Sequence, residues 1–157
     1  MSLLSRRAQI CLMPLAACGF TPAFWPNGMT GKVVAKTPTT RNDFELVKQL
    51  ELRLGRPDAG AYGLNYTITT ETVSLGFTTS GDITRYNLLG TVDWTLTDPA
   101  SGAVLDKGQA KNFTAWSATG STAAAQTVEA DASRRLMRIL ADQIVTRLTV
   151  FGAKITR

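Results

Sequence analysis

The stretch that decides the fold runs from residue 62 to residue 96 and is YGLNYTITTETVSLGFTTSGDITRYNLLGTVDWTL. Large apolar side chains alternate with small polar ones, first at Tyr62, Leu64, Tyr66 and Ile68 and then from Tyr86 to Leu96. Alternation with a period of two is typical of antiparallel strands that bury one face. Ser80-Gly81-Asp82 separates the two runs, so the stretch predicts a long β-hairpin.

The first run is expected to shift its phase at Glu71-Thr72, so that Val73, Leu75 and Phe77 continue on the apolar face. After the hairpin, residues 98–102 (DPASG) form a strong turn signal, because proline fixes φ early and glycine permits a positive φ late. A third long strand is predicted from Ala103 to Trp116.

A short strand and a helix are predicted before the hairpin. Residues 32–36 (KVVAK) are β-branched in the middle and end at a Thr-Pro pair. Asn42 is the expected N-cap of the helix, with Glu45 in capping-box position. Gly55 and Pro57 end the helix. Its apolar stripe comprises Phe44, Val47, Leu50 and Leu54, widened by Leu46 and Leu52.

A longer helix is predicted at the end of the chain, from Ala125 to Val150, after a small polar loop at residues 117–125. Apolar residues recur every four positions at Val128, Ala132, Leu136, Leu140, Ile144 and Leu148. The element order is therefore strand, helix, three strands, helix (β-α-β-β-β-α). Two one-sided helices must bury their stripes on a sheet, which predicts a two-layer α+β domain. Both helices would pack on one face of a mainly antiparallel sheet of about four strands.

The arginines of the last helix, Arg134, Arg135 and Arg138, could form an anion site or a solvated face. The spacings Asp131 to Arg135 and Arg138 to Asp142 are those of i,i+4 ion pairs. The solvated face is the favoured interpretation.

The N-terminus has the features of a removable export signal. Arg6 and Arg7 precede a short apolar stretch from Ala8 to Leu15, which is far too short to span a membrane. The stretch ends in residues 15–18 (LAAC), which look like the lipobox of bacterial lipoproteins. Cys18 is therefore the predicted lipidation site, residues 1–17 the signal peptide, residues 18–31 a lipid-anchored tether, and residues 32–157 a single domain.

The composition argues against several function classes. The net charge of +5 falls to +3 once Arg6 and Arg7 leave with the signal, which is too small an excess for a nucleic-acid-binding surface. The chain contains no histidine, and the mature cysteine would carry the lipid, so common triads and zinc sites cannot form. No metal and no cofactor other than the covalent lipid are expected.

A hydrolase that uses paired carboxylates is the enzymatic alternative. Asp93, Asp98 and Asp106 lie around the same predicted turn and could approach one another. Turns favour aspartate for structural reasons, however, and no pocket motif accompanies the three residues. The chain is therefore expected not to be an enzyme.

Three stretches and the element order carry a family resemblance. The stretches are LAACGFTP at residues 15–22, RNDFEL at residues 41–46, and LELRLGR at residues 50–56 leading into YGL at residues 62–64. On these residues the chain resembles the LptE family of lipopolysaccharide-assembly lipoproteins in its alphaproteobacterial form.

The resemblance implies a lipoprotein on the periplasmic side of the outer membrane, where it plugs the β-barrel translocon LptD. It would assist the folding of that barrel and help to insert lipopolysaccharide into the outer leaflet. Gly19 after the cysteine also favours the outer membrane. The alternative is a periplasm-facing lipoprotein that serves as an auxiliary subunit of another lipid-transport system.

The resemblance also implies basic lipopolysaccharide contacts near the sheet ends, for which Arg85, Lys107 and Lys111 are the candidates. Basic residues at such positions also discourage edge-to-edge pairing of strands, which is the structural alternative. Trp116, beside the polar loop, is the candidate partner-interface aromatic, whereas Trp94, Tyr62 and Tyr66 are expected in the core.

Overall fold

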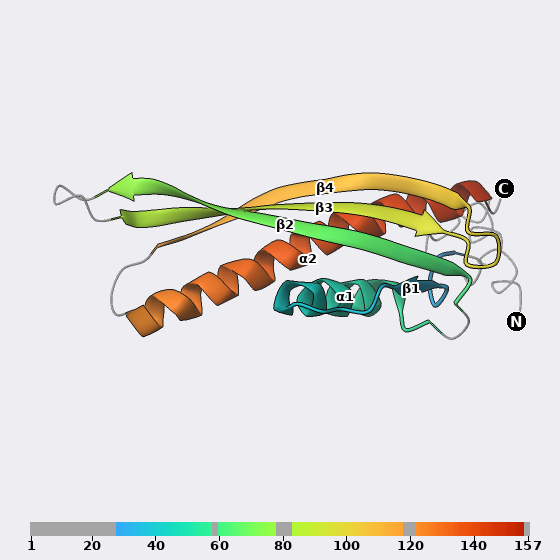
Figure 1. The fold of residues 1–157 in the computed structure, drawn as a ribbon, viewed down its shortest axis with the longest axis horizontal. Coiled ribbons are helices and arrows are strands. Elements are labelled where there is room, and N and C mark those ends of the chain that lie inside the picture. The colour runs from blue at the N-terminus through green and yellow to red at the C-terminus, as the bar shows by residue number, and fades with distance from the viewer. Residues whose placement is uncertain (1–27, 58–59, 78–82, 118–121, 156–157) are drawn as a thin grey trace, which may run out of the picture.

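The chain folds into a long twisted sheet with two helices along one of its faces (Figure 1). The computed structural model describes residues 28–57, 60–77, 83–117 and 122–155. Its elements are β1 (Val33–Ala35), α1 (Arg41–Leu54), β2 (Tyr62–Phe77), β3 (Ile83–Thr97), β4 (Val104–Ser117) and α2 (Thr122–Ile155). The predicted α+β class and the predicted element order are confirmed.

The four strands lie in the order β1-β2-β3-β4. β1 pairs in parallel with the first residues of β2, while β2–β3 and β3–β4 are antiparallel. β1 is only three residues long and ends opposite Leu64, so most of β2 extends past it. The turn between β3 and β4 forms as predicted: the Asp98 carboxylate accepts from Ala100 N–H (2.9 Å) and the Ser101 hydroxyl (2.7 Å), and Gly102 has a φ of 71°.

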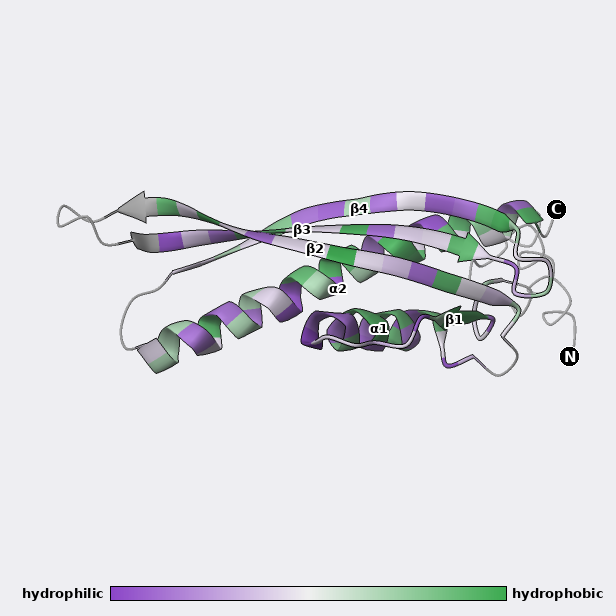
Figure 2. Cartoon of the chain, viewed as in Figure 1, coloured by the Kyte–Doolittle hydropathy of each residue, from purple (hydrophilic) through white to green (hydrophobic). Residues whose placement is uncertain are grey.

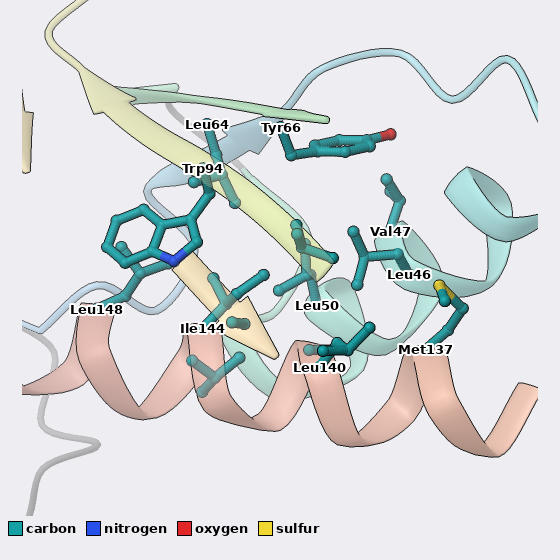
Figure 3. Packing of buried hydrophobic residues seen from close by; sticks show 14 of the residues in the cluster. Leu46, Val47, Leu50, Leu64, Tyr66, Trp94, Met137, Leu140, Ile144 and Leu148 are labelled. Atoms are coloured by element: carbon teal, nitrogen blue, oxygen red, sulfur yellow. The ribbon is translucent and has the colours of Figure 1, made fainter. Parts of the chain in front are cut away.

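The core lies between the sheet and the helices (Figure 3). Even-numbered residues of β2 and β3 point inward, as the alternation predicts, and Leu64, Tyr66, Val92, Trp94 and Leu96 are all buried. α2 supplies the longest apolar row, with Leu136, Met137, Leu140, Ile144 and Leu148 fully buried. α1 adds Leu46, Val47, Leu50 and Leu54, so both helices cover the same face.

The start of α1 differs from the prediction. Thr40, not Asn42, is the N-cap: its hydroxyl accepts from Asp43 N–H (3.2 Å), and the Asp43 carboxylate accepts from Thr40 N–H (3.0 Å). The apolar stripe also differs from the prediction, because the buried residues of α1 are Leu46, Val47, Leu50 and Leu54. Phe44 and Leu52 were expected to be buried but are 59% and 68% exposed.

The phase shift predicted in the first strand of the hairpin is wrong. β2 stays in continuous register with β3 through Glu71 and Thr72, and the first irregularity falls between Ser74 and Gly76. Leu75 therefore lies outside the core and is 54% exposed.

α2 is longer than predicted and begins at Thr122, so the end of the predicted loop is helical. Its 34 residues span about 51 Å at the usual helical rise. Figure 1 shows the helix crossing the sheet diagonally, from the β4 side near its C-terminus to a position well clear of the strands at its N-terminus. Val128, predicted on the apolar stripe, lies in those outer turns and is 39% exposed. Within the described residues, neither helix is long and apolar enough to cross a membrane.

Candidate functional site

The sheet face opposite the helices is the candidate functional surface, and we call it the outer face. The register places the odd-numbered residues of β2, β3 and β4 on this face, because the even-numbered ones enter the core. In its middle the residues are almost all polar, as the hydrophilic colour along β4 indicates (Figure 2). They are Asn65, Thr67, Thr69, Thr91, Asp93, Thr95, Lys107, Gln109 and Lys111.

A hollow of about 680 Å³ lies over part of this polar surface. Lys36 and Lys107 contribute to its lining together with Thr67, Asp93 and Gln109. The Gln109 amide donates to the Asp93 carboxylate at 2.6 Å, which fixes both side chains. The hollow therefore offers two ammonium groups and several hydroxyl and amide groups to a polar, anionic ligand.

Tyr66 holds the backbone of Lys36 in place through its side chain. Its hydroxyl donates to the carbonyl oxygen of Lys36 at 3.2 Å. Burial raises the pKa of Tyr66 to about 12, and the nearby Asp43 carboxylate adds to the effect. The phenol thus remains a protonated donor at neutral pH.

All three predicted basic contacts occupy odd-numbered positions and so lie on the outer face, but only two of them are near each other. Lys107 and Lys111 both lie on β4, and their four-residue separation corresponds to about 13 Å along a strand. Arg85 lies on β3, six residues before Thr91, the register partner of Lys111, which is about 20 Å away. The structure therefore places the two lysines near each other on this face and leaves Arg85 at the far end of it.

Trp116, the predicted interface aromatic, is only 7% exposed. Its indole stacks on the Tyr86 ring, with centroids 5.1 Å apart and planes at 15°. An interface role for Trp116 stays a prediction, now with little free surface available for it. Cys18, the predicted lipidation site, lies outside the described residues.

The outer face also has an apolar part that the sequence analysis missed. Leu89 pairs directly with Phe113, and these side chains are 40% and 58% exposed. Leu75 lies on the same half of the hairpin. Strict alternation was the signal that could have found them, since Leu89 and Phe113 occupy odd positions in strands whose even positions form the core. The outer face is therefore amphipathic, with lysines over one part and apolar side chains over the next.

The arginines of α2 behave largely as a solvated face. Asp131 pairs with Arg135 at 3.1 Å, as predicted, and with Arg134 at 3.3 Å. The predicted pair of Arg138 with Asp142 is wrong, because Asp142 instead pairs with Arg53 of α1 at 2.8 Å. That contact joins the two helices and could not be found from spacing along one helix.

The three aspartates considered for hydrolysis all accept hydrogen bonds with structural roles. Asp93 binds Gln109, Asp98 stabilises the turn before β4, and Asp106 accepts from Lys107 N–H at 2.9 Å. Hydrogen bonds from Ser101 and Ala100 lower the pKa of Asp98. In the described part of the chain, no cluster of acidic or sulfur side chains could hold a metal ion.

The chain matches the family model of LptE, described as lipopolysaccharide-assembly, over residues 32–148. Its fold is similar to that of a lipoprotein from Caulobacter crescentus, with a TM-score of 0.68 and 22% identity over 78% of this chain and 92% of that one. A minor lipoprotein of Acinetobacter baumannii has a TM-score of 0.63 and 18% identity, over 78% of this chain and 93% of that one.

The rare lipoprotein B of Shewanella oneidensis has a TM-score of 0.62 and 13% identity, over 80% of this chain and 98% of that one. Among curated proteins, none matches the chain significantly. At these identities the similar structures establish the fold, and the family model establishes the relationship.

Proposed function

The chain belongs to the LptE family of lipopolysaccharide-assembly lipoproteins, and from this premise we propose that it acts as a plug in the LptD β-barrel. In this role it assists the assembly of the barrel and the insertion of lipopolysaccharide into the outer leaflet. The family is non-enzymatic and works with LptD and lipopolysaccharide. The amphipathic outer face is the observation that favours a lipid-handling role for this particular chain.

The placement of the chain follows from the proposed processing. Residues 1–17 are removed as a signal peptide, Cys18 receives the lipid, and residues 18–31 tether the domain of residues 32–157 to the outer membrane on its periplasmic side. A single acyl chain gives only marginal anchoring, whereas several chains hold a protein stably. The lipid thus keeps the small domain beside its membrane-embedded partner.

The outer face fits an amphiphile that carries phosphate groups. Lys107 and Lys111 provide positive charge for phosphates, and the Leu89–Phe113 pair begins two residues further along β4. The sugar hydroxyls of such a molecule can bond to the threonine, asparagine and glutamine side chains of the hollow. Arg85 remains a candidate contact for a phosphate at the hairpin end.

Copurification from outer membranes tests the proposed partner. Tagged full-length protein, extracted in mild detergent, should bring down a large β-barrel protein in equimolar amount. Recovery of a soluble protein or a transport subunit, with no barrel, would overturn the plug and favour the auxiliary-subunit function.

Charge reversal tests the proposed lipid contacts. The double substitution Lys107→Glu and Lys111→Glu should weaken binding of purified lipopolysaccharide by about tenfold or more, since each buried or desolvated charge contact is worth about 1.5–3 kcal/mol. Lys48→Glu with Arg138→Glu changes the charge equally on the helix layer and serves as the matched control. Equal binding by both double variants would exclude the two lysines of β4.

A further inference from the structure

The two edges of the sheet differ in how their backbone groups are satisfied. On β4, the odd-numbered residues direct their N–H and C=O groups away from β3, because the even-numbered ones bond to it. Three of these outward groups bind side chains. Asp106 accepts from Lys107 N–H (2.9 Å), Asn112 accepts from Phe113 N–H (2.8 Å), and Gln143 of α2 donates to the Lys111 carbonyl (3.3 Å). Bound in this way, the β4 edge is a poor template for another strand.

The opposite edge is open over most of its length. β1 covers only the start of β2, where Tyr62 N–H donates to Lys32 and the Leu64 carbonyl accepts from Lys36 N–H. Past this point the even-numbered residues of β2 continue to direct their backbone groups away from β3. In the described part of the chain, no side chain or strand bonds to the outward groups of Ile68, Thr70 or Thr72. Figure 1 shows β2 running far beyond β1, and past β1 no further strand lies along the edge of β2 that faces away from β3.

A cavity of about 350 Å³ lies beside this open edge, on the helix side of the sheet. Thr70 and Thr72 line it from β2, Arg41 and Glu45 from α1, and Glu129 and Arg134 from α2. Asn42 and Ser133 close its floor through a hydrogen bond of 2.7 Å. Every second side chain of a strand added to β2 would point towards the helices and hence into this cavity.

We propose that the β2 edge from Ile68 to Ser74 binds an extended segment of the barrel partner as a fifth strand of the sheet. The backbone ladder supplies affinity, and one long polar side chain of the segment enters the cavity, whose two arginines and two glutamates select it. The identity of the partner rests on the proposed function. A second copy of this chain fits less well, since antiparallel pairing about Thr70 would turn Ile68, Thr70 and Thr72 of that copy towards the helices and so offer no long polar side chain to the cavity.

Hydrogen exchange at single-residue resolution tests this proposal, comparing the full lipoprotein alone in detergent with its copurified complex. The amides of Ile68, Thr70 and Thr72 should exchange fast in the free protein and at least about tenfold more slowly in the complex. The intervening amides of Thr69 and Glu71 already bond to β3 and should change little. This alternation is the signature of strand addition, because coverage by a bulky surface would protect neighbouring amides alike.

The outcomes separate this proposal from the function on which it rests. Absence of a barrel in the preparation refutes the proposed function. A copurified barrel that leaves the three amides fast refutes strand addition and retains the plug. Slow exchange of the same amides in the free protein would indicate a second copy, and this also overturns the proposal.

Substitutions provide a second test. Thr70→Pro removes an outward N–H without breaking a bond to β3, and should lower the recovered barrel by about fivefold, the value of one backbone hydrogen bond. Ala115→Pro makes the same change on the β4 edge and should leave recovery unchanged. Ala130→Leu, which fills the cavity without touching a strand, should lower the recovery of the barrel in the same way. Normal recovery of the barrel with both Thr70→Pro and Ala130→Leu would overturn the proposal.

Discussion

Replacing Gly108 with alanine is expected to destabilise the protein by about 1–2 kcal/mol. Gly108 of β4 lies opposite Trp94 of β3, and its missing side chain would point into the core. A methyl group there would lie 2.8 Å from Cζ2 and 3.0 Å from Cε2 of the Trp94 indole. The ring is rigid and only 3% exposed, so it has no room to move aside.

The size of the effect follows from two opposing terms. Forcing an extra methyl group into a packed core costs about 1–3 kcal/mol. Replacing a strand glycine by alanine gains about 0.5–1 kcal/mol, because the unfolded chain loses conformational freedom. The steric term is the larger one, which gives a net loss and a fall in Tm of roughly 3–8 °C for a chain of this size.

Urea unfolding followed by tryptophan fluorescence measures the change directly. Lys107→Ala, one residue away on the outer face, is the control and should change the free energy of unfolding by less than about 0.5 kcal/mol. A Gly108→Ala protein more stable than the parent would refute the close contact with Trp94. A double substitution provides a further check. Trp94→Leu makes room for the methyl group, so Gly108→Ala should lower the free energy of unfolding by less in the Trp94→Leu protein than in the parent.

Four further predictions concern the α2 core, the cap of α1 and the buried phenol of Tyr66 on β2. Leu136→Ala, at a fully buried position, should cost about 2–5 kcal/mol in urea unfolding, whereas Val128→Ala should cost less than about 0.5 kcal/mol. Thr40→Ala should cost about 1 kcal/mol by removing the N-cap, and a neutral effect would argue against the observed capping box. For Asp43, burial raises the pKa, but the hydrogen bonds from Thr40 and Thr39 outweigh this effect and lower the pKa below 3.8. The ionised carboxylate therefore stabilises the folded state above pH 3.8. This contribution is lost as the pH falls through the lower folded-state pKa. Asp43→Asn should therefore flatten the acid limb of a plot of stability against pH. For Tyr66, the raised pKa makes stability fall as the pH rises above 10, and Tyr66→Phe should abolish that alkaline loss.

Much of the sheet could be predicted from sequence because alternation along a strand reports directly on burial. Leu64, Tyr66 and Trp94 all occupy the core as their spacing indicates. The alternation rule was not followed where an apolar residue stands at an odd, outward-facing position. Leu75 was assigned to the core because it is apolar, although strict counting places it outside, where it contributes to a surface rather than to packing.

The helix features that were missed depend on choices between near neighbours. Thr40 and Asn42 are both good caps, and the reciprocal hydrogen bonds between Thr40 and Asp43 accompany the earlier start. The ion pair between Arg53 and Asp142 joins residues far apart in sequence. The open β2 edge was equally hidden, because it depends on how little of β2 the short β1 covers.

α2 comes after every strand that it covers, and this order has a consequence for folding. α2 packs against α1, β3 and β4, yet its 34 residues follow all three of these elements in the chain. Until they are available, the inner face of the sheet has only α1 to cover it, and Val92 and Trp94 remain in contact with water. A chain that emerges N-terminus first therefore exposes this apolar face until α2 packs on it, and such exposed surface promotes aggregation.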